Sequence, residues 1–126
     1  MPHLAIEYTR NLSDTLNVDA LMKSLHSTAQ RLGVFPNWGI RTFATRIDLW
    51  QIGDDIVGDI NGYVHVRVKI ASGRDDATLR RIVDELHSAL QRTLEPICTS
   101  QPVGYQIEIH EFNPATTRSG GSIPDQ

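Results

Sequence analysis

The chain repeats one order of periodicities in its two halves, and this repeat constrains the fold more than any other feature of its 126 residues. In the first half, apolar residues of 4–8 alternate with the others, which is the two-residue period of a strand. Apolar residues at helical spacing then predict a helix over 19–32, with Asp19 as its N-cap and Gly33 after its last turn. The β-branched and aromatic residues of 40–50 predict a second strand.

The second half follows the same order and begins with a clearer strand. Residues 63–71, YVHVRVKIA, place β-branched residues on one face and charged or polar residues on the other. Either Asp75 or Asp76 is expected to cap a second helix, which has one apolar stripe and ends near Pro96. A final strand is predicted within residues 105–112.

Two consecutive β-α-β units predict an α+β domain of two layers, one of strands and one of helices, which is an α/β two-layer arrangement. Because a strand-helix-strand crossover is normally parallel and right-handed, two such units side by side form one mixed four-stranded sheet with both helices on one face. We expect a single domain over residues 1–112. The polar, turn-rich residues 113–126 are expected to form a tail that is either disordered or packed on a neighbouring subunit.

The apolar residues of the strands predict a further layer on the opposite face of the sheet. We expect that two helices cannot cover all of Phe43, Ile47, Leu49, Trp50 and the valines of 64–68. A symmetric oligomer, in which copies cover the faces or edges of one another's sheets, supplies this layer and protects the edge strands.

The charge pattern excludes several kinds of partner. A net charge of −3, a pI of about 5.9 and the lack of a Lys/Arg run give no electrostatic attraction to nucleic acid or anionic lipid. No apolar run approaches the length of a membrane span, and the N-terminus lacks the features of a signal peptide. Cys98 is the only cysteine, which excludes an intrachain disulfide. We therefore expect a soluble, cytoplasmic protein.

The sequence contains no pattern for a metal or an organic cofactor. Its histidines are spread along the chain without the close pair of a metal-binding helix, at His3, His26, His65, His87 and His110. The serines lack a nucleophile-elbow context, and the glycine-bearing turns lack a phosphate-loop pattern. Covalent hydrolysis and nucleotide binding are therefore poor hypotheses, and no cofactor is expected.

A proline directly follows the first methionine and opens the first predicted strand. A strand tolerates proline at its first residue, so Pro2 alone requires no functional explanation. If Met1 is removed, however, Pro2 becomes a secondary amine whose direction is fixed by its ring. An α-amino group has a pKa of about 7.7–8.0, which burial and nearby cations lower. Such an amine is a general base suited to neutral pH.

Two arginines occupy equivalent places in the two halves. Arg41 begins the second predicted strand after a glycine-bearing turn, and Arg74 separates the third strand from the second helix. Anions bind at strand ends and helix N-termini, and the guanidinium group binds carboxylates in bidentate fashion and stabilises an enolate. Either arginine could equally be a solvated residue at a strand boundary.

Several stretches in a fixed order carry a family resemblance. These are MPH with the following EY, the turn GVFPNWGIR, the sequence DLWQ, and VHVRVKIASGR. Together they resemble the 5-carboxymethyl-2-hydroxymuconate isomerase family of the tautomerase superfamily, over about residues 2–112.

The resemblance implies a homotrimer of small subunits that works without a cofactor. In this family the processed N-terminal proline moves a proton along a dienol–enone system, and the substrate is a small polycarboxylate from bacterial aromatic catabolism. By position, the resemblance makes Pro2 the base, and Arg41 and Arg74 the groups that bind carboxylates and the oxygen on which negative charge develops.

Other residues are candidates for shaping the pocket. Phe35, Trp38 and Trp50 would form apolar walls that exclude water and lower the pKa of the amine, and each is equally explained as a core or subunit-contact aromatic. The long acidic stretch at 53–61 is expected to alter the pocket rim, and with it the substrate preference.

Two alternative functions stay open. One is a hydratase or dehalogenase acting on an unsaturated acid, which needs an additional acid or water-activating group, for which Glu7, Glu108 and Glu111 are candidates. The other is a non-catalytic trimeric ligand-binding module, in which Pro2 only starts an edge strand.

Overall fold

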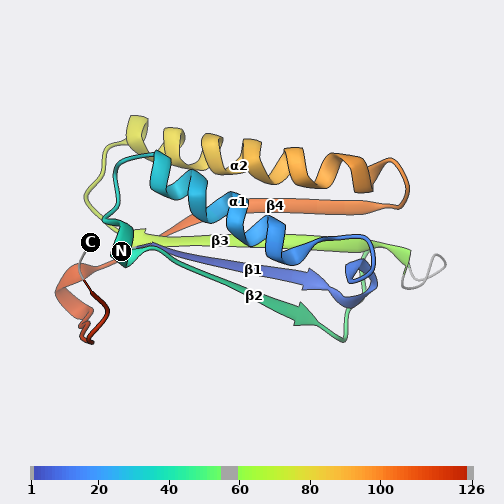
Figure 1. Ribbon diagram of the computed structural model, residues 1–126, viewed down its shortest axis with the longest axis horizontal. Helices are drawn as coiled ribbons and strands as arrows, with labels where there is room; N and C mark the ends of the chain where they lie inside the picture. Colours follow the sequence, from blue (N-terminus) through green and yellow to red (C-terminus); the bar gives the residue numbers. More distant parts are fainter. Residues whose placement is uncertain (1, 55–59, 125–126) are drawn as a thin grey trace.

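A computed structural model describes residues 2–54 and 60–124 and has two layers, a four-stranded sheet and a pair of helices (Figure 1). Met1, residues 55–59 of the acidic stretch and residues 125–126 of the tail lie outside the described residues. The elements are β1 (His3–Thr9), η1 (Arg10–Leu12), α1 (Val18–Arg31), η2 (Asn37–Gly39), β2 (Arg41–Ile47), β3 (Gly62–Ala71), α2 (Asp76–Cys98), β4 (Val103–Phe112) and η4 (Pro114–Thr116).

The two β-α-β units predicted from the sequence are confirmed. β1 and β2 are parallel, β3 and β4 are parallel, and the antiparallel pairing of β1 with β3 joins the units into the order β2-β1-β3-β4. Figure 1 shows α1 and α2 side by side on the same face of the sheet. The sheet is therefore mixed, with one face covered by helices and one face uncovered within the chain.

The core lies between the sheet and the helices. Val64, Val66 and Val68 are fully buried there, in register with Leu4 and Ile6 of β1. Within the set that two helices were expected not to cover, these valines need no further layer, because they alternate in phase with the apolar residues of β1 and all face the helices. Their number therefore gives no reason for a second apolar layer.

The uncovered face of the sheet is mostly charged and polar. His65, Arg67 and Lys69 of β3 project there, since they alternate with the buried valines. The exposed apolar side chains that remain from the predicted set are Phe43, which is 54% exposed, and Leu49, which is 92% exposed.

The helix ends differ in part from the expected ones. Asn17, rather than Asp19, caps α1, because its side-chain oxygen accepts the N–H of Ala20 at 3.0 Å. Gly33 follows α1 with a φ of +72°, the left-handed conformation expected of it.

The second helix starts as expected and ends later than predicted. Asp75 caps α2 by accepting the N–H of Thr78 at 2.9 Å. The helix runs through Pro96 to Cys98, because a proline in the last turn removes only one hydrogen bond near an end that already lacks partners.

The strand directions bring four strand ends to one edge of the sheet. The first residues of β1 and β2 lie beside the last residues of β3 and β4, since His3 is in register with both Arg41 and Lys69, and Lys69 with His110. We call this edge the Pro2 edge, because Pro2 directly precedes β1. None of the helices in the described part of the chain has the length and hydropathy of a membrane-spanning segment.

Candidate active site

Pro2 is held at the Pro2 edge by the backbone of the neighbouring strand. Its side chain is buried, and its carbonyl oxygen accepts the backbone N–H of Arg41 at 3.1 Å. The parallel pairing of β1 with β2 begins at this point. The pairing of β1 with β2 therefore holds Pro2 and Arg41 beside each other at the first residues of these two strands.

The side chain of Arg41 lies on the uncovered face of the sheet and contacts His3. Its Nη1 donates to His3 Nε2 at 3.2 Å, and the imidazole ring meets Phe43 edge-on at a centroid distance of 6.1 Å. Burial lowers the pKa of His3, and the positive charges of Arg41 and Lys69 lower it further. His3 is therefore neutral near pH 7 and acts as an acceptor for the guanidinium group.

His3 was not among the predicted site residues. Its orientation, opposite to Leu4, is as the strand alternation predicts. Its contact with Arg41 depends on the register of β1 with β2, and this register is not contained in the alternation of either strand.

Arg74 is positioned by the loop between β3 and α2. Its Nη1 donates to the carbonyl of Ala71 at 3.2 Å, and its Nη2 donates to the carbonyl of Val34 at 3.3 Å. The guanidinium carbon lies 5.0 Å from the ring centre of Phe35, a cation–π contact. Gly73, with a φ of +120°, allows the chain to turn directly before Arg74.

The structure brings the three predicted site residues to one edge but not into one contact cluster. Pro2 precedes β1, Arg41 begins β2, and Arg74 follows β3. Within one chain, however, the Arg41 guanidinium contacts His3 on the uncovered face, whereas that of Arg74 contacts the backbone of Val34 beside Phe35.

Two of the three candidate wall aromatics lie near this edge. Phe35 is buried against the core and stacks with Arg74, and Trp38 lies in η2 immediately before β2. Trp50 follows the far end of β2, where Arg10 lies over its ring at 5.7 Å. Because the seven residues of β2 span about 20 Å, Trp50 could line a pocket at the Pro2 edge only from another copy of the chain.

The candidate acids belong to a network further along the uncovered face. Glu108 accepts from His65 Nε2 and from His110 Nε2, each at 2.6 Å, and Glu7 lies 3.6 Å from His65 Nδ1. The hydrogen bonds from His65 and His110 lower the pKa of Glu108. No group of three or more metal-ligating side chains is arranged around a common centre within residues 2–54 and 60–124.

Glu111 is separate from this network. It is in register with Ile70, whose side chain is buried under the helices, so Glu111 lies on the opposite side of the sheet from Glu7 and Glu108. The three carboxylates therefore do not form one group.

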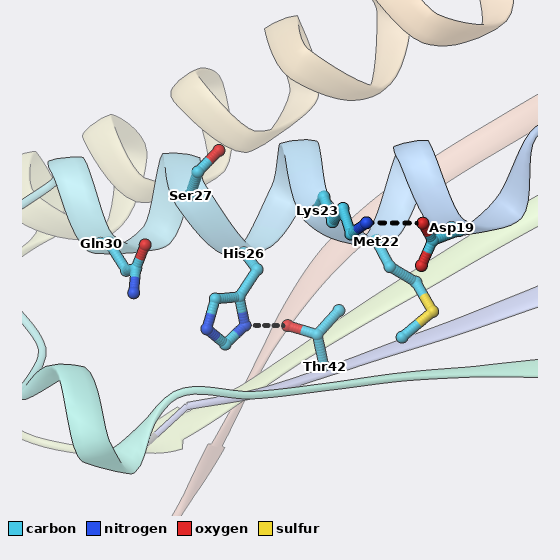
Figure 2. A pocket seen from close by; sticks show the side chains of 7 residues that line it. All are labelled: Asp19, Met22, Lys23, His26, Ser27, Gln30 and Thr42. Atoms are coloured by element: carbon cyan, nitrogen blue, oxygen red, sulfur yellow. Dashed lines mark hydrogen bonds and ion pairs between the residues drawn. The ribbon is translucent and has the colours of Figure 1, made fainter.

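A depression of about 410 Å³ lies between α1 and β2, and none of the predicted site residues lines it. Figure 2 shows the imidazole of His26 pointing from α1 toward Thr42 of β2, with Met22 beside them. His26 Nδ1 and Thr42 Oγ1 are 2.8 Å apart, and Lys23 pairs with Asp19 at 2.8 Å. His26 and Lys23 are thus already engaged with neighbouring side chains, and Pro2, Arg41 and Arg74 do not line the depression.

The fold, together with its solved neighbours, defines a class of protein, the tautomerase superfamily. A crystal structure of a 5-carboxymethyl-2-hydroxymuconate isomerase from Deinococcus radiodurans R1 superposes with a TM-score of 0.88 at 28% identity, covering 97% of this chain and 90% of that one. A solved structure described as a fused 4-OT wild type symmetric trimer gives a TM-score of 0.68 at 12% identity, covers 91% of each chain, and shows the fold alone.

Within that class, the chain belongs to the 5-carboxymethyl-2-hydroxymuconate isomerase family, whose model matches residues 2–125. The 5-carboxymethyl-2-hydroxymuconate Delta-isomerase of Escherichia coli is 25% identical over 114 residues, covering 90% of this chain and 89% of its relative. The resemblance found in the sequence is thereby confirmed. The chain is an isomerase of the tautomerase superfamily, and neither alternative function is better supported.

Proposed function

We propose that this chain, once Met1 is removed, converts a dienol into the conjugated enone on a 2-hydroxymuconate-type polycarboxylate such as 5-carboxymethyl-2-hydroxymuconate. The Escherichia coli relative is named for that compound. The observation that carries the proposal is the placement of Pro2, Arg41 and Arg74 at one edge of the sheet, where the strand register joins Pro2 to Arg41 through a 3.1 Å backbone hydrogen bond.

Pro2 serves as the base. Its neutral nitrogen accepts the proton of the 2-hydroxyl group, the oxygen electron pair forms the carbonyl, and the conjugated π electrons shift along the chain. The protonated nitrogen then returns that proton to a carbon of the conjugated chain, so that the product is an isomer of the substrate. Pro2 is buried, and the two arginines lie at the same edge. Burial and nearby cations both favour the neutral form of an amine, which is the form that can act as a base.

Arg41 and Arg74 supply the complementary charge. Each guanidinium group binds a carboxylate, and their positive charge stabilises the oxygen while negative charge develops on it. Arg74 is held in place for this role by the carbonyls of Ala71 and Val34 and by the ring of Phe35. Phe35 and Trp38 limit the access of water to the amine.

The active assembly we propose is a cytoplasmic homotrimer with one domain per subunit over residues 1–112. A structural neighbour is described as a symmetric trimer, and the chain leaves one sheet face and the edge strand β2 uncovered. Exposed Phe43 and Leu49 provide apolar surface for contacts between copies. The tail of residues 113–126 stays a prediction, either disordered or packed on a neighbouring subunit; its residues 113–124 are exposed, and Pro114–Thr116 form η4.

The test is an ultraviolet assay with the demethionylated protein, whose processing is verified by intact mass. The dienol band of 5-carboxymethyl-2-hydroxymuconate should disappear on mixing. Pro2→Ala should lower kcat by about 10²-fold or more, at least as much as Arg41→Ala does, because general-base catalysis typically contributes 10²–10⁴-fold.

A form that retains Met1 is the matched control, because its Pro2 nitrogen is a tertiary amide without basicity. It should fold normally and lack isomerase activity. Equal rates for Pro2→Ala and the parent, or full activity with Met1 attached, would reject Pro2 as the base.

A further inference from the structure

The uncovered face of the sheet has a row of basic residues next to Pro2. Arg41, His3, Lys69 and His110 are neighbours in register, one on each of the four strands. The row itself contains no carboxylate. Arg41 and Lys69 are cations on either side of the neutral His3, so an anion beside the row would be attracted to both.

Part of this row lines a recess of about 390 Å³. The recess is lined by His3, Ala5, Arg67, Lys69 and His110. Ala5 has only a methyl group, so the floor stays open between the longer side chains around it. The opening faces away from the helices, on the face where the Arg41 guanidinium also lies.

The side chains of the recess differ in how far their charges are already neutralised. Arg67 Nη2 lies 3.5 Å from Glu7 Oε1, and His110 donates to Glu108. Lys69, by contrast, forms no ion pair with a carboxylate of the described residues, and its Nζ lies 6.0 Å from the ring centre of Phe112. Lys69 therefore provides a cation that a ligand carboxylate can pair with.

His3 connects the recess to the site already described. Its Nε2 accepts from Arg41, which leaves the ring proton on Nδ1 as a neutral donor. An anion in the recess would thus lie one side chain away from Arg41.

We propose that the recess formed by His3, Arg67 and Lys69 binds a carboxylate group, and that it holds the third carboxylate of the substrate assigned under the proposed function, on which this part of the inference rests. 5-Carboxymethyl-2-hydroxymuconate bears three carboxylates, and the two arginines Arg41 and Arg74 account for two. The recess makes Lys69 a specificity-determining residue for tricarboxylates over dicarboxylates.

The experiment compares the processed parent protein with Lys69→Gln and with Lys23→Gln, a control that removes a charge from the helix surface. Isothermal titration with propane-1,2,3-tricarboxylate, which does not react, measures binding directly. Lys69→Gln should weaken binding by about tenfold, since a hydrogen bond to a charged group contributes this much or more. Lys23→Gln should bind like the parent.

A second readout is the ratio of kcat/KM for 5-carboxymethyl-2-hydroxymuconate to kcat/KM for 2-hydroxymuconate, which has two carboxylates. The ratio should fall by about tenfold in Lys69→Gln, mainly through KM, and should stay constant in Lys23→Gln. A third result is that the parent binds the tricarboxylate, loses this binding in Lys69→Gln, and yet isomerises no dienol. That result would refute the proposed function but support the carboxylate site.

Two results would overturn the inference. One is equal tricarboxylate affinity in Lys69→Gln and the parent. The other is displacement of the tricarboxylate by equimolar inorganic phosphate with no effect on isomerisation, since the recess would then be a general anion site that the substrate does not use.

Discussion

At the scale of single residues, the hydrogen-bonded carboxylate of Glu108 on the uncovered face affects the stability of the fold. Glu108 receives hydrogen bonds from His65, His110 and Gln106, of which the two from histidine are 2.6 Å long. Arg67 is its neighbour in register on β3. The hydrogen bonds from His65 and His110 stabilise the ionised carboxylate, which is why its pKa lies below the ordinary value of 4.5.

This pKa shift predicts a pH-dependent stability. A carboxyl group with a depressed folded-state pKa contributes stability above its unfolded value, and this contribution is lost as the pH falls through the folded value. The parent should therefore melt at a higher temperature than Glu108→Gln at about pH 6, and the difference should shrink toward about pH 3. Thermal unfolding followed by circular dichroism measures both, and a difference that stays constant over this range would contradict the assignment.

At the scale of elements, close packing between β3 and the turn after β1 joins the two halves. Gly62, the first residue of β3, is buried beside Leu12 of η1, and its N–H donates to the carbonyl of Pro102 at 2.9 Å. A Cβ at Gly62 would lie 2.5 Å from Leu12 Cδ2. The glycine is therefore required by the approach of a neighbouring side chain.

Replacing this glycine should destabilise the domain. Gly62→Ala is expected to lower the free energy of unfolding by about 1–3 kcal/mol, the usual cost of overpacking a filled core. Gly120→Ala is the matched control, because a Cβ there meets nothing within 4 Å, and its effect should stay within about 0.5 kcal/mol. Urea unfolding measures both variants, and equal midpoints would show that Leu12 moves aside without cost.

At the scale of the whole molecule, the two faces of the sheet have different roles. The helices cover one face, and the other is charged and uncovered. The buried apolar residues between sheet and helices suffice for a core within one chain. The uncovered face bears the basic row and the Glu108 network, and its exposed apolar residue on β2 is Phe43. We therefore expect contacts between copies to centre on Phe43 at the β2 edge, so that the recess on β1, β3 and β4 stays open to a ligand.

The proposed homotrimer should have three times the chain mass of 14.1 kDa in sedimentation equilibrium. Phe43→Asp should shift the mass toward that of the monomer, since Phe43 is 54% exposed on an edge strand and an aspartate there would oppose apolar contact. Lys23→Gln should leave the mass unchanged. A monomeric parent at micromolar concentration would contradict the trimer.

The sequence by itself determined the order of the elements and the buried face of each strand. The alternation of residues 63–71 and the apolar stripe of the second helix depend on local geometry, in which each side chain's direction follows from its position along the element. The places of Pro2, Arg41 and Arg74 at strand boundaries follow from the same local patterns.

Tertiary structure alone decided which side chains meet. The contact of His3 with Arg41, the basic row across four strands and the distance of Trp50 from the Pro2 edge all depend on strand register and direction. For the valines of β3, which already share a face by alternation, the pairing with β1 decided that they lie in register with Leu4 and Ile6 beneath the helices. Register is fixed by the packing of the whole core, because a shift of one residue would turn every buried side chain to the other face.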